Sequence, residues 1–332
     1  MYSDEDLNRA VEQGIFTPAA VASFRHHMAD VRQTAAVDEE NFRLIGGFND
    51  IFVVIACLIV TYSAAWMAAE FNAVAGPLVM VACAWGLAEF FVRRRKMALP
   101  AIVLLLLFLW GVFKTCVAGV GMSNGSSLTL ALAITALAAG AHWWRFHVPI
   151  TVAAGMAAIV GLVFYFLLSV FPQSREWVTY IVLLGGVGTF VIAMLWDMSD
   201  RQRLTRRSDV AFWLHLLSAP LIVHPIFASL GVLSGNDSVG NVLAIVSVYV
   251  VMTVVSLVID RRAFMVSSLA YVLYAVSTLL DTYGSVGSNL AVTGVIIGGA
   301  LLLLAGFWHS ARSGLVSRLP SALQQRVPVV NE

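Results

Sequence analysis

Lysine, cysteine and charge of either sign are scarce in this sequence. Only two of its 332 residues are lysines, Lys96 and Lys114, three are cysteines, and charged residues make up 12% of the chain. Soluble globular domains contain about 25% charged residues, so this composition does not supply the surface of a water-soluble protein. The hydrophobic share of 60% indicates instead that lipid surrounds most of the chain.

Several catalytic and ligand-binding motifs are missing as well. The chain contains no HExxH zinc motif, no GxxxxGK[ST] phosphate loop and no CxxC pair, which argues against a zinc protease and an ATP-driven pump. Cys57, Cys83 and Cys116 are widely spaced within apolar runs, which favours packing over metal binding. The longest basic run, residues 93–96, borders an apolar run, so we predict no nucleic-acid partner. Because these motifs are missing and the cysteines are widely spaced, we also predict no metal and no cofactor.

Long apolar runs, by contrast, recur throughout the chain after residue 50. A helix needs about 20 mostly apolar residues to cross the hydrocarbon core of a bilayer. The runs show no strand-like alternation of apolar and polar residues. We therefore predict an all-α integral membrane protein with about ten transmembrane helices. The predicted spans cover residues 51–69, 74–92, 98–120, 127–144, 148–171, 178–196, 210–232, 239–259, 264–281 and 289–308.

Basic residues collect in alternate loops between these spans. Loops rich in arginine and lysine face the cytoplasm, which predicts cytoplasmic positions for both termini. Tryptophans near the span ends are typical of interfacial anchors. The basic residues are Arg93, Arg94, Arg95, Lys96, Arg145, Arg201, Arg203, Arg206, Arg207, Arg261, Arg262, Arg312 and Arg318, and the tryptophans are Trp66, Trp143, Trp144, Trp177, Trp196 and Trp308.

The polar N-terminal segment predicts a helical hairpin over residues 3–36. Gly14 is a natural helix stop, and Thr17 followed by Pro18 is a typical helix start. The second helix carries an apolar stripe at helical spacing, which must be buried on the first helix, the membrane surface or a partner protein. Residues 1–36 are therefore a candidate docking site for a cytoplasmic protein.

The stretch EQGIFTPAAVASF, residues 12–24, lies between and within these short helices. With its surroundings, over about 35 residues, it resembles the N-terminus of uncharacterised bacterial predicted membrane proteins that form a family of unknown function. The resemblance implies a location in the bacterial inner membrane and no activity.

The first four predicted spans align with the last four when the sequence is shifted by 167 residues. Arg145 then matches Arg312, and His142 matches His309. Such a match predicts two parallel four-helix repeats joined by a two-helix bridge, although identities between apolar segments also arise by chance. The expected organisation is a hairpin and linker (1–47), repeat one (48–147), a bridge with a basic loop (148–208), repeat two (209–312) and a cytoplasmic tail (313–332).

Lys114 is a cation within an apolar run, and the same shift places it near Asp281. Ionisable groups in membranes usually face the bundle interior and pair, so a Lys114–Asp281 pair between the repeats is one hypothesis. The other is that Lys114 extends to the outer headgroups while Asp281 caps its own span.

The seventh predicted span contains His215, Pro220, His224 and Pro225. Nine residues of helix place the two histidines on opposite faces and ~13.5 Å apart along the axis, too far to hold one metal. Each proline removes a backbone donor and favours a kink, so this span is the predicted wall of a cavity on a ligand or ion pathway. The alternative for His224 is a neutral ring bonded to a backbone carbonyl.

Polar residues at the cytoplasmic ends of the spans have simpler interpretations. His142, His309, Arg145 and Arg312 are candidates for contact with the membrane interface. Glu89 precedes Arg93 by one helical turn, which predicts an ion pair. The acidic residues of the basic loops, Asp197, Asp200 and Asp260, are interpreted as solvated charges.

Three functions remain open. The leading hypothesis is a transporter or permease for a small solute or ion, because many spans, a repeat and intramembrane ionisable groups are typical of that class. The second is a non-catalytic membrane scaffold or sensor that uses the N-terminal hairpin. The third is a lipid-modifying membrane enzyme that uses His142 or His224.

Overall fold

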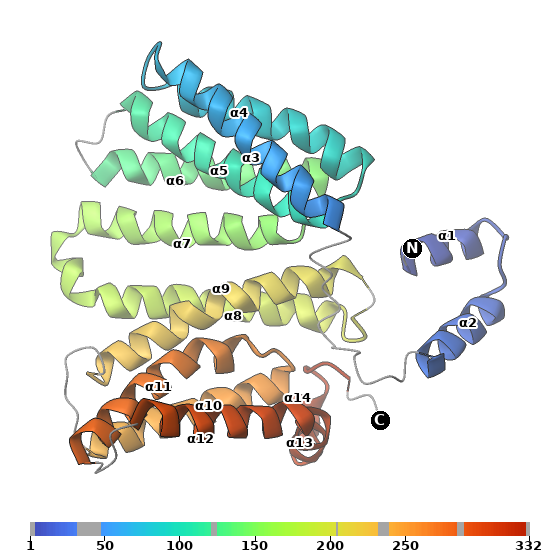
Figure 1. The fold of residues 1–332 in the computed structure, drawn as a ribbon, viewed down its shortest axis with the longest axis vertical. Coiled ribbons are helices and arrows are strands. Elements are labelled where there is room, and N and C mark those ends of the chain that lie inside the picture. Colours follow the sequence, from blue (N-terminus) through green and yellow to red (C-terminus); the bar gives the residue numbers. More distant parts are fainter. Residues whose placement is uncertain are drawn as a thin grey trace. The chain divides into compact units, whose positions relative to one another are not determined.

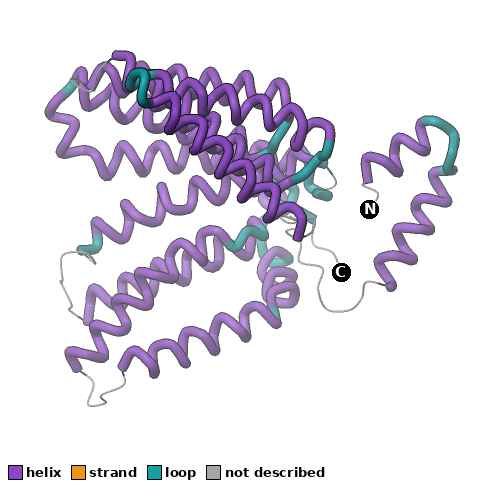
Figure 2. Tube along the Cα trace, turned by 45° about the horizontal axis from the view of Figure 1, so that its top comes forward, coloured by secondary structure: helices purple, strands orange, loops and turns teal. Residues whose placement is uncertain are grey.

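The computed structural model of the chain describes residues 4–31, 48–120, 125–203, 205–231, 239–283 and 289–329. Every regular element within those ranges is helical (Figure 2). The chain divides into two compact units, residues 1–43 and residues 44–332, which are treated separately below.

The small N-terminal unit contains two helices, α1 (Asp4–Glu12) and α2 (Pro18–Val31). Gly14 has a φ of 72° in the turn between them, a conformation that glycine adopts without steric cost. The hydroxyl of Thr17 accepts a hydrogen bond from the backbone N–H of Ala20, and the guanidinium of Arg25 donates to Asn8 of α1. The turn and this contact fold α2 back onto α1.

The large unit consists of helices joined by short turns (Figure 1). A helix satisfies its own backbone hydrogen bonds, as a chain surrounded by lipid must. The elements are α3 (Phe48–Ala69), α4 (Ala75–Ala88), the π-helical turn η1 (Glu89–Arg94), α5 (Ala98–Val120), α6 (Gly125–Phe146), α7 (Ile150–Val170), the 3₁₀ turn η2 (Pro172–Trp177), α8 (Val178–Ser199), α9 (Arg206–Ser229), α10 (Val239–Ile259), α11 (Ala263–Tyr283), α12 (Asn289–Gly306), α13 (Trp308–Val316) and α14 (Ser321–Gln324).

Eight helices in the described part of the chain are long and apolar enough to cross a membrane: α3, α4 with η1, and α5 to α10. Two further apolar helices, α11 and α12, are shorter over the residues that could be assessed, 263–277 and 297–306. Each of the ten predicted spans coincides with a helix. The predicted all-α fold with apolar helices of membrane-spanning length is therefore confirmed for the described residues, while the count of ten spans stays a prediction.

The helices of the large unit pack as two groups with α7, α8 and α9 between them (Figure 1). In the first group, α5 packs against α3, α4 and α6, and α6 packs in turn against α7. In the second group, α11 packs against α9, α10 and α12. Helices α8 and α9 form an extensive antiparallel pair that connects the groups.

Helix α9 runs without interruption through Pro220 and Pro225. Proline removes the hydrogen bond to the carbonyl four residues earlier, which for Pro225 is that of Leu221. Gly186 of α8 faces this segment, and a Cβ on it would lie 2.8 Å from the carbonyl carbon of Leu221. The absence of a side chain at residue 186 thus lets α8 cover the weakened part of α9 closely.

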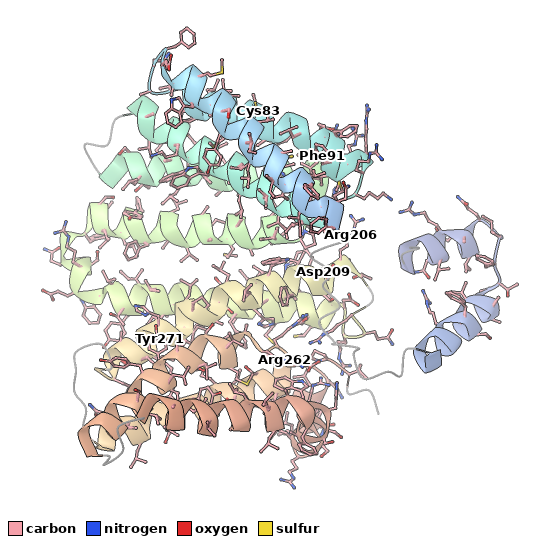
Figure 3. The ribbon with its side chains drawn as sticks, viewed as in Figure 1. Cys83, Phe91, Arg206, Asp209, Arg262 and Tyr271 are labelled. Atoms are coloured by element: carbon pink, nitrogen blue, oxygen red, sulfur yellow. The ribbon has the colours of Figure 1, made fainter. Side chains whose placement is uncertain are left out.

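Four turns at one end of the large unit contain a non-glycine residue with positive φ. These residues are Lys96, His147, Arg203 and Asp260, with φ between 51° and 56°. The turns that contain them join α4 with η1 to α5, α6 to α7, α8 to α9, and α10 to α11. We call this end, which also carries most of the arginines, the basic end; Figure 3 shows Arg206, Asp209 and Arg262 there.

Candidate functional site

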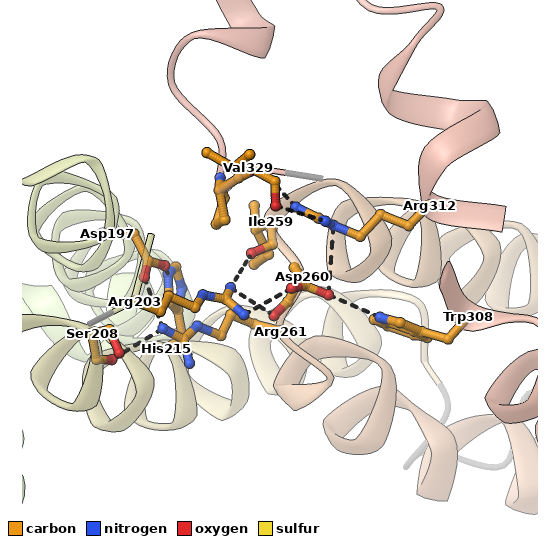
Figure 4. A network of polar contacts seen from close by, with 11 residues as sticks. Asp197, Arg203, Ser208, His215, Ile259, Asp260, Arg261, Trp308, Arg312 and Val329 are labelled. Carbon is orange, nitrogen blue, oxygen red and sulfur yellow. Dashed lines mark hydrogen bonds and ion pairs between the residues drawn. The ribbon is translucent and has the colours of Figure 1, made fainter. Parts of the chain in front are cut away.

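Asp197, near the C-terminus of α8, is the first of two buried carboxylates that form the candidate site at the basic end. Its Oδ2 lies 2.8 Å from Nε2 of His215 in α9, and its Oδ1 lies 2.8 Å from Nη2 of Arg261. Arg261 also donates to the backbone carbonyl of Ser208 at 3.0 Å. One carboxylate therefore ties α8 to α9 and to the α10–α11 turn (Figure 4).

Asp260, in the turn after α10, is the second buried carboxylate. Its Oδ2 accepts a hydrogen bond from Nη1 of Arg203 at 2.8 Å, and its Oδ1 accepts one from the indole N–H of Trp308 at 2.9 Å. Nε of Arg312 lies 3.5 Å from the same Oδ1. This carboxylate thus joins the α8–α9 turn to α13 (Figure 4).

The backbone at Arg203 and Asp260 places these side chains. Both residues adopt the left-handed conformation, which costs roughly 1–2 kcal/mol for a non-glycine residue. Arg203 Nη2 donates to the carbonyls of Ile259 and Asp260 at 3.2 Å and 3.0 Å. Burial lowers the pKa of the Arg203 guanidinium from its usual value, and the nearby Arg261 adds to this effect. An arginine pKa starts so high that the group stays charged near neutral pH.

Two arginines, Arg312 and Arg201, hold the C-terminal segment beside these carboxylates. Arg312 donates to the carbonyls of Pro328 and Val329 at 2.8 Å and 3.3 Å. Arg201 donates to the carbonyls of Gln324 and Val327, both at 3.0 Å. We use the name Asp197–Asp260 network for the side chains of Asp197, Arg203, His215, Asp260, Arg261, Trp308 and Arg312.

The Asp197–Asp260 network carries an uneven charge. Three guanidiniums face two carboxylates, so with a neutral imidazole the network has one positive charge in excess. The Nε atoms of Arg203, Arg261 and Arg312, and Nδ1 of His215, are buried and have no hydrogen-bond partner among the described residues. Such incompletely paired buried charges add little net stability, because desolvation offsets their mutual attraction.

A smaller charged cluster occupies the basic end of the first helix group. Arg145, at the end of α6, makes two hydrogen bonds to Glu89, at 2.6 Å and 2.9 Å. Arg93 lies 3.3 Å from the same carboxylate, which confirms the predicted pair one helical turn apart. These side chains are partly exposed, in contrast to the Asp197–Asp260 network.

His142, one helical turn before the end of α6, is surrounded by aromatic rings. Its ring is buried, and its centroid lies 4.6 Å from that of Phe146, 5.6 Å from that of Phe108 and 6.0 Å from that of Trp85. Nδ1 lies 3.3 Å from the hydroxyl of Thr151. The expectation of an interfacial contact is wrong for His142 because α7 and the aromatic rings cover it, whereas His309 is exposed in α13.

The two histidines of α9 have different surroundings. His215 is fully buried with Asp197, while His224 is exposed and its Nδ1 lies 2.6 Å from the hydroxyl of Tyr271 in α11. Tyr271 stacks on Phe227, with 4.7 Å between the ring centroids. The Tyr271 hydroxyl, rather than the backbone carbonyl of the alternative interpretation, is thus the hydrogen-bond partner of Nδ1 of His224.

The predicted pair of Lys114 and Asp281 involves one side chain that the structure describes and one that it does not. Lys114 lies on α5, where its Nζ is 5.5 Å from the ring centroid of Trp110. Asp281 belongs to α11, but its side chain lies outside the described residues. The predicted pair between the halves therefore stays a hypothesis. No group of three or more His, Cys, Asp or Glu that could hold a metal occurs among the residues described.

Comparison with known proteins adds no relative. No family model, curated protein or solved structure matches the chain. The interpretation of the Asp197–Asp260 network therefore depends on its geometry and on the physical chemistry of its groups.

Most of this network was not predicted from the sequence. Asp197 and Asp260 were interpreted as solvated charges, Trp308 as an anchor and Arg312 as an interfacial residue, yet all four side chains are buried. Neighbouring arginines pair with the carboxylates, and the C-terminal segment covers Arg312. The available signal was the recurrence of acids beside arginines at the ends of the second, sixth and eighth predicted spans.

Proposed function

We propose that the chain is a transporter of the permease type for a small solute or ion, with ten spans in a bacterial inner membrane and its basic end facing the cytoplasm. In this proposal the Asp197–Asp260 network is a closed gate at the cytoplasmic end. The observation that carries it is the burial of two carboxylates, two guanidiniums and an imidazole in one cluster, which the largely shielded guanidinium of Arg203 completes. Ionisable groups inside a membrane protein are functional candidates by default.

The energetics of the cluster suit a gate. A buried ion pair gains little over a solvated one, so a closed, dry network and an open, hydrated one can be close in free energy. The network also lies where relative motion of helices would open it, because its members come from the α8–α9 turn, the α10–α11 turn, α13 and α9. An opening there would admit water between α8, α9 and the second helix group.

The predicted parallel repeat supports the same function. α5 contacts α3, α4 and α6, and α11 contacts the equivalent helices α9, α10 and α12. Each half also pairs an acid near the end of its second helix with an arginine that the 167-residue shift aligns: Glu89 with Arg145 of α6, and Asp260 with Arg312 of α13. The shift does not align the two acids with each other. Parallel repeats of this kind occur in several transporter folds.

Flux into proteoliposomes tests the proposal. Purified protein is reconstituted, and uptake is followed for a panel of amino acids, sugars, organic anions and protons. We expect saturable uptake of at least one solute, and an Asp260→Asn variant should show a raised leak because it weakens the gate. Arg318→Gln, an exposed arginine at the same end, is the matched control. No uptake across the panel together with an unchanged Asp260→Asn leak would contradict the proposal.

A membrane scaffold or sensor is the second candidate, because the N-terminal unit exposes apolar side chains. Ile15, Phe16 and Phe24 are all exposed on the short helices α1 and α2 or the turn between them. Deletion of residues 1–36 separates the two candidates. A transporter should keep its flux without the hairpin, whereas a scaffold should lose a stoichiometric cytoplasmic partner and show no flux in either form.

A further inference from the structure

An aromatic hollow lies at the end of the first helix group opposite the basic end. It has a volume of about 350 Å³ and is formed by the last turns of α3, the first turns of α4 and the facing part of α5. This size is at the lower end of the ~300–1,000 Å³ typical of small-molecule pockets. Its walls are Tyr62, Ala65, Trp66, Ala69, Gly76, Pro77, Met80, Trp110 and Lys114.

Small residues form the floor of the hollow. A Cβ on Gly76 would lie 2.8 Å from the carbonyl oxygen of Ala65 and 2.9 Å from Cβ of Ala69. Helices α3 and α4 therefore lie in close contact at Gly76. The floor of the hollow at this contact is narrow and apolar. Trp66 is 78% exposed and Trp110 is 51% exposed, so these large rings stand at the rim.

Lys114 supplies the one charged group in the lining. It lies six residues before the end of α5 at Val120, ~9 Å along a helix that rises 1.5 Å per residue. The ammonium is therefore placed near the membrane interface, beside the ring of Trp110. No carboxylate pairs with Lys114 among the residues that the structure describes.

We propose that this hollow binds a membrane phospholipid with an anionic headgroup. Its phosphate pairs with the ammonium of Lys114, its glycerol region lies between Trp66 and Trp110, and one acyl chain follows the apolar floor. Charge complementarity selects an anionic headgroup, and tryptophans prefer the depth of the headgroups. The site is separate from the Asp197–Asp260 network, so it does not depend on the proposed transport function.

Native mass spectrometry of the full chain tests this inference. Protein released from a mild detergent is titrated with phosphatidylglycerol or with phosphatidylcholine of the same acyl chains, and the first bound lipid is quantified. The wild type should retain phosphatidylglycerol more tightly. Lys114→Ala should weaken that binding about fivefold, since a basic residue near an anionic headgroup contributes ~1 kcal/mol. Lys114→Arg should retain it, because the charge is kept.

The second lysine of the chain provides a matched control. Lys96 is exposed at the basic end, so Lys96→Ala should leave retention of the first phosphatidylglycerol unchanged. Trp66→Ala should weaken it, because the rim is lost. Equal retention of both lipids by the wild type would overturn the inference, as would wild-type retention by a Lys114→Ala protein that remains folded and monodisperse.

Discussion

Asp197 and Arg261 are 64 positions apart in the chain, yet Oδ1 of the carboxylate lies 2.8 Å from Nη2 of the guanidinium. Both side chains are almost completely shielded from solvent. The pair connects α8 to the turn between α10 and α11, and His215 binds the other oxygen of the same carboxylate. Any movement that separates these helices at the basic end must therefore hydrate or re-pair two charges.

Asp197→Asn should destabilise the protein by about 3–5 kcal/mol, because it leaves the buried guanidinium of Arg261 without a counter-charge. The double variant Asp197→Asn with Arg261→Met should regain most of the loss, since the guanidinium that lost its counter-charge is then removed as well. Chemical unfolding in detergent measures both. Additive losses in the double variant would show that the two charges do not act as a pair.

Trp308→Phe tests the indole contact with Asp260, a hydrogen bond of 2.9 Å to a charged group. Such bonds contribute about 1.5–3 kcal/mol, so the free energy of unfolding should fall by about that amount. Trp144→Phe is the control, because Trp144 is 81% exposed and no cost is expected there. Equal effects of the two substitutions would contradict the buried role of Trp308.

Arg145 and Arg312 occupy positions that the 167-residue shift aligns, but they differ in environment. Arg145 is partly exposed with Glu89, and exposed ion pairs contribute little to stability. Arg312 is buried and also holds the C-terminal carbonyls. Arg312→Gln should therefore lower the unfolding temperature clearly, and Arg145→Gln only slightly. A ranking in the opposite order would disagree with the burial described here.

Lys96 has a φ of 53° in an exposed turn. The left-handed conformation costs a non-glycine residue roughly 1–2 kcal/mol, which glycine avoids at the expense of some entropy in the unfolded chain. Lys96→Gly should thus stabilise the protein by up to about 1 kcal/mol, whereas Lys96→Ala should not. Thermal unfolding of both variants measures the difference.

The fold was largely predictable from the sequence because lipid imposes a simple rule on it. Each apolar run of about 20 residues must satisfy its own backbone, and each of the ten runs coincides with a helix. The π-helical turn at residues 89–94 was not foreseen, since the predicted second span simply continued to residue 92.

The candidate site was less predictable because it depends on contacts between distant turns. Residues 200, 260 and 312 look alike in sequence, as charged positions beside apolar runs. Only packing shows that Asp260 is enclosed by Arg203 and Trp308. His215 was singled out because of its place in an apolar span, but its partner Asp197 comes from another helix and from a segment interpreted as solvated.

Thiol labelling in proteoliposomes tests most directly whether the Asp197–Asp260 network opens as a gate. Two reporters are compared in a background without Cys57, Cys83 and Cys116: Ser208→Cys beside the network, and Ser268→Cys in the buried part of α11. A gate predicts that a membrane-impermeant reagent modifies residue 208 at least about tenfold faster than residue 268. Opening of the gate exposes residue 208, whereas exposure of residue 268 requires unfolding of the helices, and a tenfold difference corresponds to ~1.4 kcal/mol between the two processes. Equal rates at both positions would contradict the gate and identify the network as a fixed structural clamp.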